Sequence, residues 1–172
     1  MQGFLYSQEF TDLNLNNEAF VDILYQTLFD RDADTEGKEY WLSQLRNGTL
    51  RDMILYGFLQ SEEFTNLATS FSVESFSASD KALYQLKLFV VRFYELVLQR
   101  NPEVEGYNYW TEKLHTQTHT ANDIAVDFFF SLEFINKNHN DTTFIELAYQ
   151  TLLNRHAEPD GKFYWLTQLE QG

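Results

Sequence analysis

Cysteine is absent from this chain of 172 residues, and only two prolines and seven glycines occur in it. The lack of cysteine excludes disulfides, thiolate catalysis and zinc sites with cysteine ligands. Hydrophobic residues make up 44% of the chain and aromatic residues 17%, and no segment has low complexity. This composition indicates a folded protein that is long enough to bury a substantial core.

Basic residues are also scarce, with 12 Lys and Arg against 26 Asp and Glu and a formal net charge of −14. Nucleic acids and anionic membranes are bound by clustered Lys and Arg, so we expect neither as a partner. No apolar run approaches the ~20 residues that a membrane-spanning helix needs, so we expect no membrane insertion. A protein or glycan partner is compatible with the acidic surface.

One short motif, the Ser-x-Glu-Phe phrase, occurs three times, as GFLYSQEFTDL at 3–13, GFLQSEEFTNL at 57–67 and DFFFSLEFINK at 127–137. Three longer segments, 20–48, 89–114 and 144–172, also align without a gap. Their shared positions are Phe20, Tyr25, Arg31, Gly37, Tyr40, Trp41 and Leu45; Phe89, Tyr94, Arg100, Gly106, Tyr109, Trp110 and Leu114; and Phe144, Tyr149, Arg155, Gly161, Tyr164, Trp165 and Leu169. Matches at fixed spacing are the signature of a tandem repeat.

The repeats divide the chain into five parts. Residues 1–19 are the tail of a preceding repeat, 20–66 are repeat 1, 67–88 are a Ser-rich insertion with a linker helix, 89–137 are repeat 2, and 138–172 are the first half of repeat 3. Repeat faces need a neighbour to bury them. The chain is therefore expected either to be a window onto a longer array or to use its leading tail to complete its last half-repeat.

The apolar spacing within a repeat is helical, as in Phe20, Leu24 and Leu28, and no segment alternates with a period of two. The sequence therefore predicts an all-α fold of tandem repeats. Each repeat has about three helices plus a short Ser-x-Glu-Phe turn, and the repeats pack as small helical bundles.

Polar residues mark the expected ends of these helices. Asp34 is expected to cap a second helix that runs to Arg46, with Gly48 as its stop. Thr49 is expected to cap the third helix of repeat 1, and Thr120 or Asn122 that of repeat 2. Ser61 and Ser131 are expected to cap the short final turns, which tuck Phe64 and Phe134 inward.

The repeated glycines fall in the first turn of the second helix, where Gly costs roughly 0.5–1 kcal/mol relative to Ala. We interpret Gly37, Gly106 and Gly161 as points of close backbone approach by the first helix. The tryptophans are assigned to the core, and the preceding tyrosines to its edge. These residues are Trp41, Trp110 and Trp165, with Tyr40, Tyr109 and Tyr164.

Arg31, Arg100 and Arg155 are the basic residues that recur in all three repeats. One interpretation is recognition of a ligand by the planar guanidinium. The favoured one is a structural clasp, because half-buried arginines are normally paired. The candidate carboxylates are those three residues further on, Asp34, Glu103 and Glu158, or those of the Ser-x-Glu-Phe phrase, Glu9, Glu63 and Glu133.

Four acidic residues alternate in DRDADTEG and suggest a calcium loop: Asp30, Asp32, Asp34 and Glu36. Calcium prefers six or more oxygen ligands, but Thr35 and Trp41 stand where an EF-hand needs Gly and Glu. A solvated connector is favoured, and no other cofactor is expected. His115 and His119 form a possible metal pair without a third ligand, and Glu62 with Glu63 a possible carboxylate pair; neither makes a catalytic motif, so we expect no enzyme.

The composite of Y-x-x-x-[LV]-x-x-R, G-x-x-Y-W-x-x-x-L and S-x-E-F resembles a bacterial family known only as a domain of unknown function. Its repeats occur in tandem in secreted, surface-layer-like and adhesin-like proteins. The resemblance implies an all-helical module at the cell surface or outside the cell, without an assigned activity. SQLRNGTLRDMILYGFLQSEEF is also distantly similar to phycobilisome linker polypeptides, which implies a scaffold, although such linkers tend to be basic.

These observations lead to one expected function and two alternatives. We expect a non-enzymatic structural or interaction module of a larger bacterial secreted or surface protein. A glycan- or peptide-binding module of the adhesin type is the first alternative, because the Tyr-Trp pairs can stack on sugars. A linker or scaffold domain like those of phycobilisomes is the second.

Overall fold

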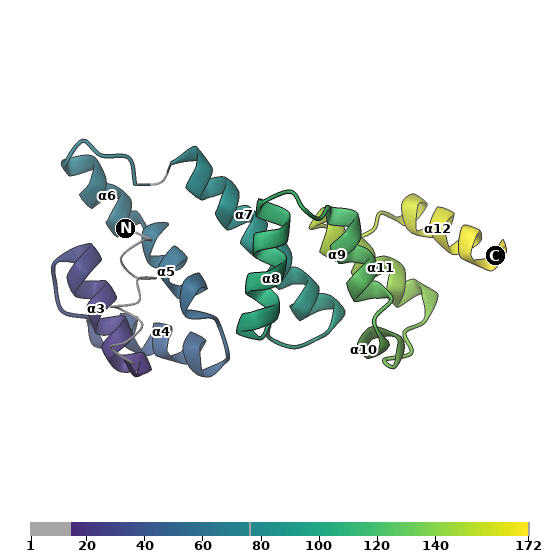
Figure 1. Cartoon of the computed structure of the whole chain (residues 1–172), viewed down its shortest axis with the longest axis horizontal. Helices are drawn as coiled ribbons and strands as arrows, with labels where there is room; N and C mark the ends of the chain where they lie inside the picture. The colour runs from purple at the N-terminus through teal and green to yellow at the C-terminus, as the bar shows by residue number, and fades with distance from the viewer. Residues whose placement is uncertain (1–14, 76, 172) are drawn as a thin grey trace. The chain divides into compact units, whose positions relative to one another are not determined.

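The computed structural model describes residues 15–75 and 77–171, and every regular element in this part of the chain is helical (Figure 1). The chain divides into two compact units after Ala78. The helices of the first are α3 (Asn17–Phe29), α4 (Thr35–Arg46), α5 (Arg51–Leu59) and α6 (Glu62–Ser70). Those of the second are α7 (Ala78–Arg92), η1 (Phe93–Val97), α8 (Val104–His115), α9 (Ala121–Phe129), α10 (Leu132–Ile135), α11 (Asp141–Leu153) and α12 (Pro159–Gln171). The all-α prediction is confirmed.

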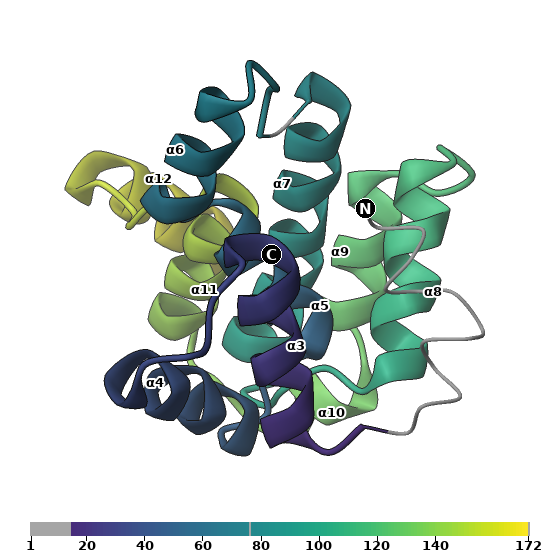
Figure 2. The ribbon, with the colours of Figure 1, turned by 90° about the vertical axis from the view of Figure 1, so that its left-hand side faces the viewer.

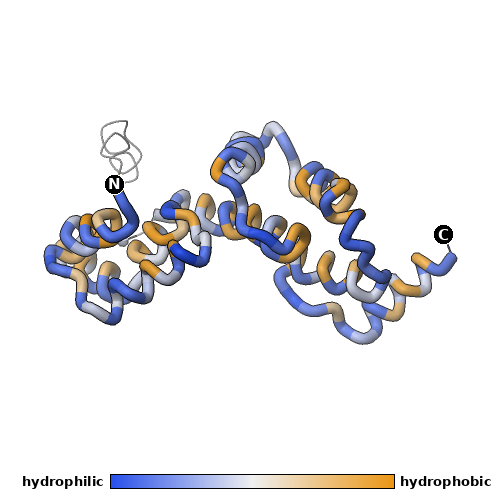
Figure 3. The backbone as a smooth tube through the Cα atoms, turned by 90° about the horizontal axis from the view of Figure 1, so that it is seen from below, coloured by the Kyte–Doolittle hydropathy of each residue, from blue (hydrophilic) through white to orange (hydrophobic). Residues whose placement is uncertain are grey.

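The first unit packs α3 against α4, α5 and α6. Figure 2 shows α3 in front, with α4 and α6 labelled beside it. Its core comes mainly from α3 and α5: Phe20, Val21, Leu24, Tyr25, Leu28, Ile54, Leu55, Phe58 and Leu59. Trp41, Leu45 and Phe64 pack against this cluster while staying partly exposed. Figure 3 shows apolar and polar residues alternating along the helical tubes. In α3 this spacing places the buried residues Phe20, Leu24 and Leu28 along one side of the helix.

The second helix of repeat 1 begins and ends where the sequence predicts. The Asp34 carboxylate accepts a hydrogen bond from the Gly37 amide at 2.7 Å, which caps the N-terminus of α4. At the other end, the Gly48 amide donates to the Leu45 carbonyl and the Thr49 amide to the Gln44 carbonyl. This pair of bonds is a Schellman motif, and Gly48 supplies the positive φ of 90° that it requires.

The prediction that Thr49 caps the third helix of repeat 1 is wrong. The N-cap of α5 is Leu50, and no side chain accepts a hydrogen bond there. Thr49 takes part through its backbone amide in the Schellman motif of the preceding helix. It therefore lies one residue before the N-cap position of α5. In repeat 2 the prediction of Thr120 is confirmed, because Thr120 and Asp123 form a reciprocal capping box at the start of α9.

The Ser-x-Glu-Phe phrase begins a helix in both complete repeats. The Ser61 and Ser131 hydroxyls each accept from the amide three residues on, at 3.1 Å. The expected short turn is found in repeat 2, where α10 has four residues and Asn138 adopts a φ of 50° after it. In repeat 1 the expectation is wrong, because α6 continues for nine residues, to Ser70.

The first helix of repeat 2 is longer than its counterparts. The chain is helical from Ala78, well before Phe89, so the predicted linker helix is continuous with the first helix of the repeat. Its last turn, η1, is π-helical. In the second unit, η1 contacts both α9 and α11, and α11 packs on α12.

Candidate functional site

The first helix of every repeat stops at a residue in the left-handed backbone conformation. Asp30, Gln99 and Asn154 each have a φ of 54° and directly precede the repeated arginine. Asp and Asn tolerate this conformation better than most residues. A shared geometry at this stop turns the chain in the same way in each repeat and presents the arginine beside the start of the second helix.

Arg31 joins the first helix of repeat 1 to the Ser-x-Glu-Phe segment through a two-point ion pair. Its Nε and Nη2 donate to the two carboxylate oxygens of Glu63 at 2.7 and 2.9 Å. Its Nη1 also donates to the N-cap carboxylate of Asp34 at 3.3 Å. One guanidinium therefore links the end of the first helix, the start of the second helix and the Ser-x-Glu-Phe segment, and both of the predicted types of partner are used at once.

Repeat 2 reproduces this clasp. Arg100 Nε and Nη2 donate to Glu133 at 2.8 and 3.2 Å, and Nη1 pairs with Glu103. In repeat 3, Arg155 pairs with Glu158 through Nη1. Among the described residues, Nε and Nη2 of Arg155 have no carboxylate partner. Glu9, the remaining predicted partner of this type, lies outside the described residues.

The arginines also lie over the rings of the repeated tyrosines. The Cζ atom lies 4.9 Å from the ring centroid of Tyr25, 5.2 Å from that of Tyr94 and 5.1 Å from that of Tyr149. A guanidinium at this distance is attracted to the ring face. The tyrosine and arginine positions of the repeat are thus two halves of one contact.

The clasp shifts the pKa values of its members. The hydrogen bond to Glu63 raises the pKa of Arg31, and the same bond lowers the pKa of Glu63. Burial, followed by the nearby Glu103 carboxylate, raises the pKa of Tyr94 to about 12. The arginine and glutamate therefore stay charged and the tyrosine neutral at physiological pH, as expected for a structural ion pair.

The repeated glycines make room for a tyrosine hydroxyl. A Cβ atom on Gly37 or Gly106 would lie 2.2 Å from the hydroxyl oxygen of Tyr25 or Tyr94, and on Gly161 2.5 Å from that of Tyr149. The predicted close approach is real, but the predicted partner is wrong. The first helix contributes a side chain there, and its backbone does not make the contact.

Two of the three tryptophans lie where the sequence places them. The Trp41 indole stacks on the Phe58 ring, with centroids 4.8 Å apart, and Trp110 is only 6% exposed beside Phe128. Phe134 is buried and Phe64 half-buried. The preceding tyrosines lie edge-on to the indoles and stay about half exposed: Tyr40, Tyr109 and Tyr164.

The core assignment of Trp165 is wrong, since this residue is 49% exposed. In repeats 1 and 2, a phenylalanine from the third helix covers the tryptophan. Repeat 3 has only α11 and α12 in the described part of the chain, so no third helix covers the indole there.

A second ion pair joins the first two helices in repeats 1 and 3, and the sequence interpretation missed it. Lys38 Nζ donates to Asp22 at 2.7 Å, and Lys162 Nζ to Glu146 at 3.2 Å. A signal was available, because both repeats have an acid two residues after the first Phe and a Lys directly after the Gly. Repeat 2 replaces this pair with Val91 and the buried Tyr107.

Repeat 3 extends this pair into a small polar cluster. His156 Nδ1 lies 2.5 Å from the Glu146 carboxylate, and Gln150 Nε2 donates to it at 3.2 Å. The bond to His156, with further bonds from Lys162 and Gln150, lowers the pKa of Glu146 to about 2 despite partial desolvation. The cluster therefore holds its carboxylate ionised, the opposite of what a general acid needs.

The carboxylates of the suspected calcium loop have separate roles. Asp30 is the left-handed stop of α3, Asp32 accepts from Gln26 at 3.4 Å, and Asp34 caps α4 and binds Arg31. Glu36 lies in the first turn of α4, where the helix dipole favours an acid. Among residues 15–75 and 77–171, no three side chains of His, Asp or Glu gather into a possible metal site.

The other candidates are not brought together into a reactive site. His115 ends α8, whereas the His119 ring lies 5.8 Å from the Trp110 ring, with which it packs edge to face. Glu63 is engaged by Arg31, while the neighbouring Glu62 is exposed.

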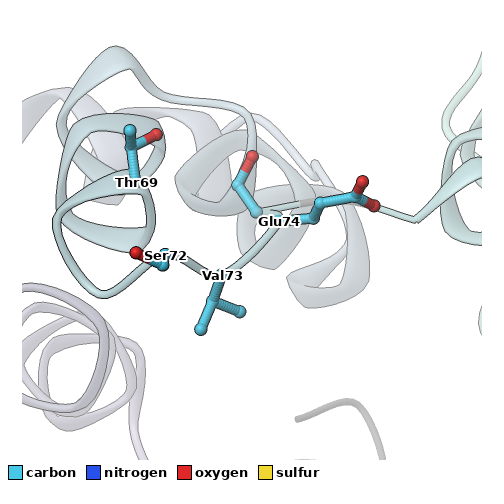
Figure 4. Close-up of a pocket in the computed structure, with 5 residues that line it drawn as sticks. Thr69, Ser72, Val73 and Glu74 are labelled. Atoms are coloured by element: carbon cyan, nitrogen blue, oxygen red, sulfur yellow. The ribbon is translucent and has the colours of Figure 1, made fainter.

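An open pocket of about 370 Å³ lies at the end of α6, lined by Thr69, Ser72, Val73, Glu74 and Ser75. In Figure 4 the Glu74 carboxylate points away from the Thr69 and Ser72 side chains. These groups do not converge as an acid-base pair or a nucleophile with its base would.

Within the described residues, none of the helices combines the length and the apolar character needed to cross a membrane.

The fold and the repeated clasp define an all-α protein built of tandem helical repeats. Three consecutive segments, residues 1–68, 72–138 and 128–172, match one family profile, described as Domain of unknown function (DUF4214). The chain belongs to this family, since the matches cover nearly its whole length. No curated protein and no solved structure matches the chain.

Proposed function

We propose that the chain is a non-enzymatic structural module, a run of helical repeats that serves as a spacer or scaffold in a larger bacterial secreted or surface protein. The supporting observation is the use of the repeated residues. In repeats 1 and 2 the arginine binds its glutamate and lies over the tyrosine of the first helix, whose hydroxyl lies against the glycine. The tryptophan packs on a phenylalanine of the third helix in the same repeat. Side chains that are engaged in contacts within a repeat stabilise the module, and this use does not require a catalytic role.

The surface location is the part of the proposal that rests on the family resemblance of the repeated motif. The net charge of −14 supports it only in a general way, since an acidic exterior keeps an array soluble. The distant likeness to phycobilisome linkers points to the same scaffold role, but the charge of this chain is opposite to that expected of such linkers.

A second candidate is a glycan- or peptide-binding module. It is favoured by the exposed tyrosines Tyr40, Tyr109 and Tyr164, which occupy one position of the repeat and present about half of their surface to solvent. An exposed aromatic ring can stack on a sugar or on an apolar side chain.

Binding assays on matched variants separate the two candidates. The full chain and its Tyr40→Ala, Tyr109→Ala and Tyr164→Ala variants are applied to a glycan array and a peptide array, with thermal melts as a folding control. The structural proposal expects no binding that depends on these tyrosines. Binding that the parent shows and Tyr109→Ala loses, with an unchanged melting curve, would replace it with the second candidate.

A further inference from the structure

The end of α4 is followed by a chemically labile pair, Asn47 and Gly48, and the sequence contains no other Asn-Gly. Both residues are exposed, so water and base can reach them. Asparagine is a thermolabile residue, because the backbone nitrogen of the next residue can attack its side-chain carbonyl carbon. A following glycine makes this attack easiest, since it has no Cβ to obstruct the approach and its backbone turns freely.

The reaction at this pair consumes only water. The Gly48 nitrogen loses its proton and bonds to Cγ of Asn47, and the side-chain nitrogen leaves as ammonia. The product is a five-membered succinimide ring. Water then opens the ring at one of its two carbonyl carbons. One opening gives aspartate, and the other gives isoaspartate, in which the main chain runs through the former side chain.

The fold holds the attacking nitrogen away from the side chain. Asn47 has a φ of −78° and a ψ of 2°. With ψ near zero, the Gly48 nitrogen lies beside the backbone nitrogen of Asn47, whereas ring closure requires it to lie beside Cβ. Because ψ is one of the two soft backbone dihedrals, a rotation about the Cα–C bond of Asn47 has to precede the reaction.

Two hydrogen bonds of the Schellman motif oppose this rotation. The Gly48 amide donates to the Leu45 carbonyl at 3.1 Å, and the Thr49 amide donates to the Gln44 carbonyl at 3.0 Å. The rotation swings both amides away from the end of α4, so both bonds break. Such local opening costs free energy, and the reaction proceeds only from the fraction of molecules that are open.

We propose that Asn47 is a deamidation site that the folded end of α4 keeps closed and that opening of this end exposes to reaction. Either product places a carboxylate at the C-terminus of α4, where the helix dipole disfavours negative charge. Isoaspartate also adds an atom to the main chain between α4 and α5, which the hydrogen bonds of the stop do not accommodate. Deamidation therefore records irreversibly that the link between these helices has opened.

This inference is independent of the proposed function. The same chemistry applies whether the chain is a scaffold or a binding module, and the array assays do not measure it.

Repeat 2 has the same helix stop without the labile pair. Thr116 is the C-cap of α8, with a φ of −80° and a ψ of 0°. Gln117 follows with a φ of 57°, and its amide donates to the Leu114 carbonyl at 3.2 Å. Threonine thus fits the C-cap position, so Asn47→Thr removes the reactive side chain while leaving the stop in place.

The rate of deamidation in the folded and the unfolded full chain tests the proposal. Both samples are incubated at mildly alkaline pH, one in buffer and one in guanidinium chloride. Trypsin cleaves after Arg46 and Arg51, so the peptide of residues 47–51 reports aspartate and isoaspartate at position 47 by liquid chromatography and mass spectrometry. A time-zero sample corrects for reaction during digestion, and Asn47→Thr is the blank.

We expect the product to form at least about tenfold more slowly in the folded chain than in guanidinium chloride. Equal rates in the two samples would overturn the proposed protection. The absence of product in guanidinium chloride would overturn the assignment of the site.

Thr49→Pro tests the hydrogen bonds of the stop. Proline lacks the amide that donates to Gln44, so the rate in the folded variant should rise toward the rate in guanidinium chloride. Thr49→Ala is the matched control, since it keeps this amide, and it should react at the rate of the parent. Circular dichroism checks that both variants are folded. A folded Thr49→Pro variant that reacts no faster than the parent would contradict the role of the stop, and the comparison of folded and unfolded parent decides the proposal if this variant does not fold.

Discussion

Each repeated glycine and its tyrosine occupy one space between two helices. The side chain of Tyr25 reaches from α3 to the first turn of α4, and the missing Cβ of Gly37 leaves room for its hydroxyl. The tyrosine ring also carries the arginine on one face. Glycine is therefore needed here because of a neighbour, while its backbone is ordinary helix.

Gly37→Ala should destabilise the protein by about 1–3 kcal/mol, less the gain of up to ~1 kcal/mol that Ala brings to a helix. In a Tyr25→Phe background the hydroxyl is absent, so the same substitution should cost much less. Urea denaturation of the two single variants and the double variant measures the coupling. Equal costs in both backgrounds would contradict the proposed contact.

The pH dependence of stability should report the Arg31–Glu63 pair. The ion pair lowers the pKa of Glu63 in the folded state from its ordinary value of 4.5. Its contribution is therefore complete above that value and is lost as the pH falls through the lower folded pKa. Both side chains are about two-fifths exposed, so we expect at most about 1 kcal/mol.

Glu63→Gln removes this ionisation with little change in shape. The difference in unfolding free energy between parent and variant should shrink as the pH is lowered from 7 to 3. Glu62→Gln provides the matched control, because it removes a carboxylate from the same helical turn and leaves the Arg31–Glu63 pair in place, so at pH 7 it should cost less than Glu63→Gln. A difference that stays constant over this range would show that the ion pair does not stabilise the fold.

At the scale of the helices, whether a threonine caps a helix depends on its immediate neighbours in the sequence more than on its position within the repeat. Thr120 forms a capping box with Asp123, whereas Thr49, two residues before α5, makes no cap and serves the Schellman motif after α4. Two threonines before equivalent helices thus have different roles.

Thr120→Ala should lower the free energy of unfolding by about 1 kcal/mol, since it removes the acceptor for the Asp123 amide. Thr49→Ala is the matched substitution before α5 and should change it by less than half as much. Thermal or urea unfolding of both variants makes the comparison. A larger loss for Thr49→Ala would mean that the assigned cap of α5 is incorrect.

At the scale of the whole molecule, three tandem segments of one family share a single acidic chain. The three repeats share the arginine and tyrosine contacts, but the described part of the chain provides a third helix only in repeats 1 and 2. Repeats 1 and 2 close their cores with a third helix, while in the described part of repeat 3 the indole of Trp165 is about half exposed.

Calcium should leave the melting temperature of the full chain unchanged. Asp30 is a helix stop, Asp32 a hydrogen-bond acceptor, and Asp34 both a helix cap and an arginine partner, so these carboxylates have roles that need no ion. Glu36 lies in the first turn of α4. Melts in millimolar calcium and in excess chelator should therefore coincide. A shift of several degrees between the two conditions would reveal a structural ion.

Much of the architecture could be predicted because it is encoded locally. The cap at Asp34, the stop at Gly48 and the serine caps before Phe64 and Phe134 depend on residues within a few positions of one another. The Arg31 clasp was predictable only as alternatives. Its carboxylate partners lie three and 32 positions away, and the sequence does not show that one guanidinium reaches both.

The sequence by itself determined the helical class, the three tandem repeats and the positions that every repeat shares, because periodicity and caps act along the chain. Only the tertiary structure decided what those positions touch. It paired Gly37 with a hydroxyl, joined Lys38 to Asp22, and left Trp165 exposed although its sequence context matches that of Trp110. Burial depends on which helix lies opposite, and that is a property of the assembled fold.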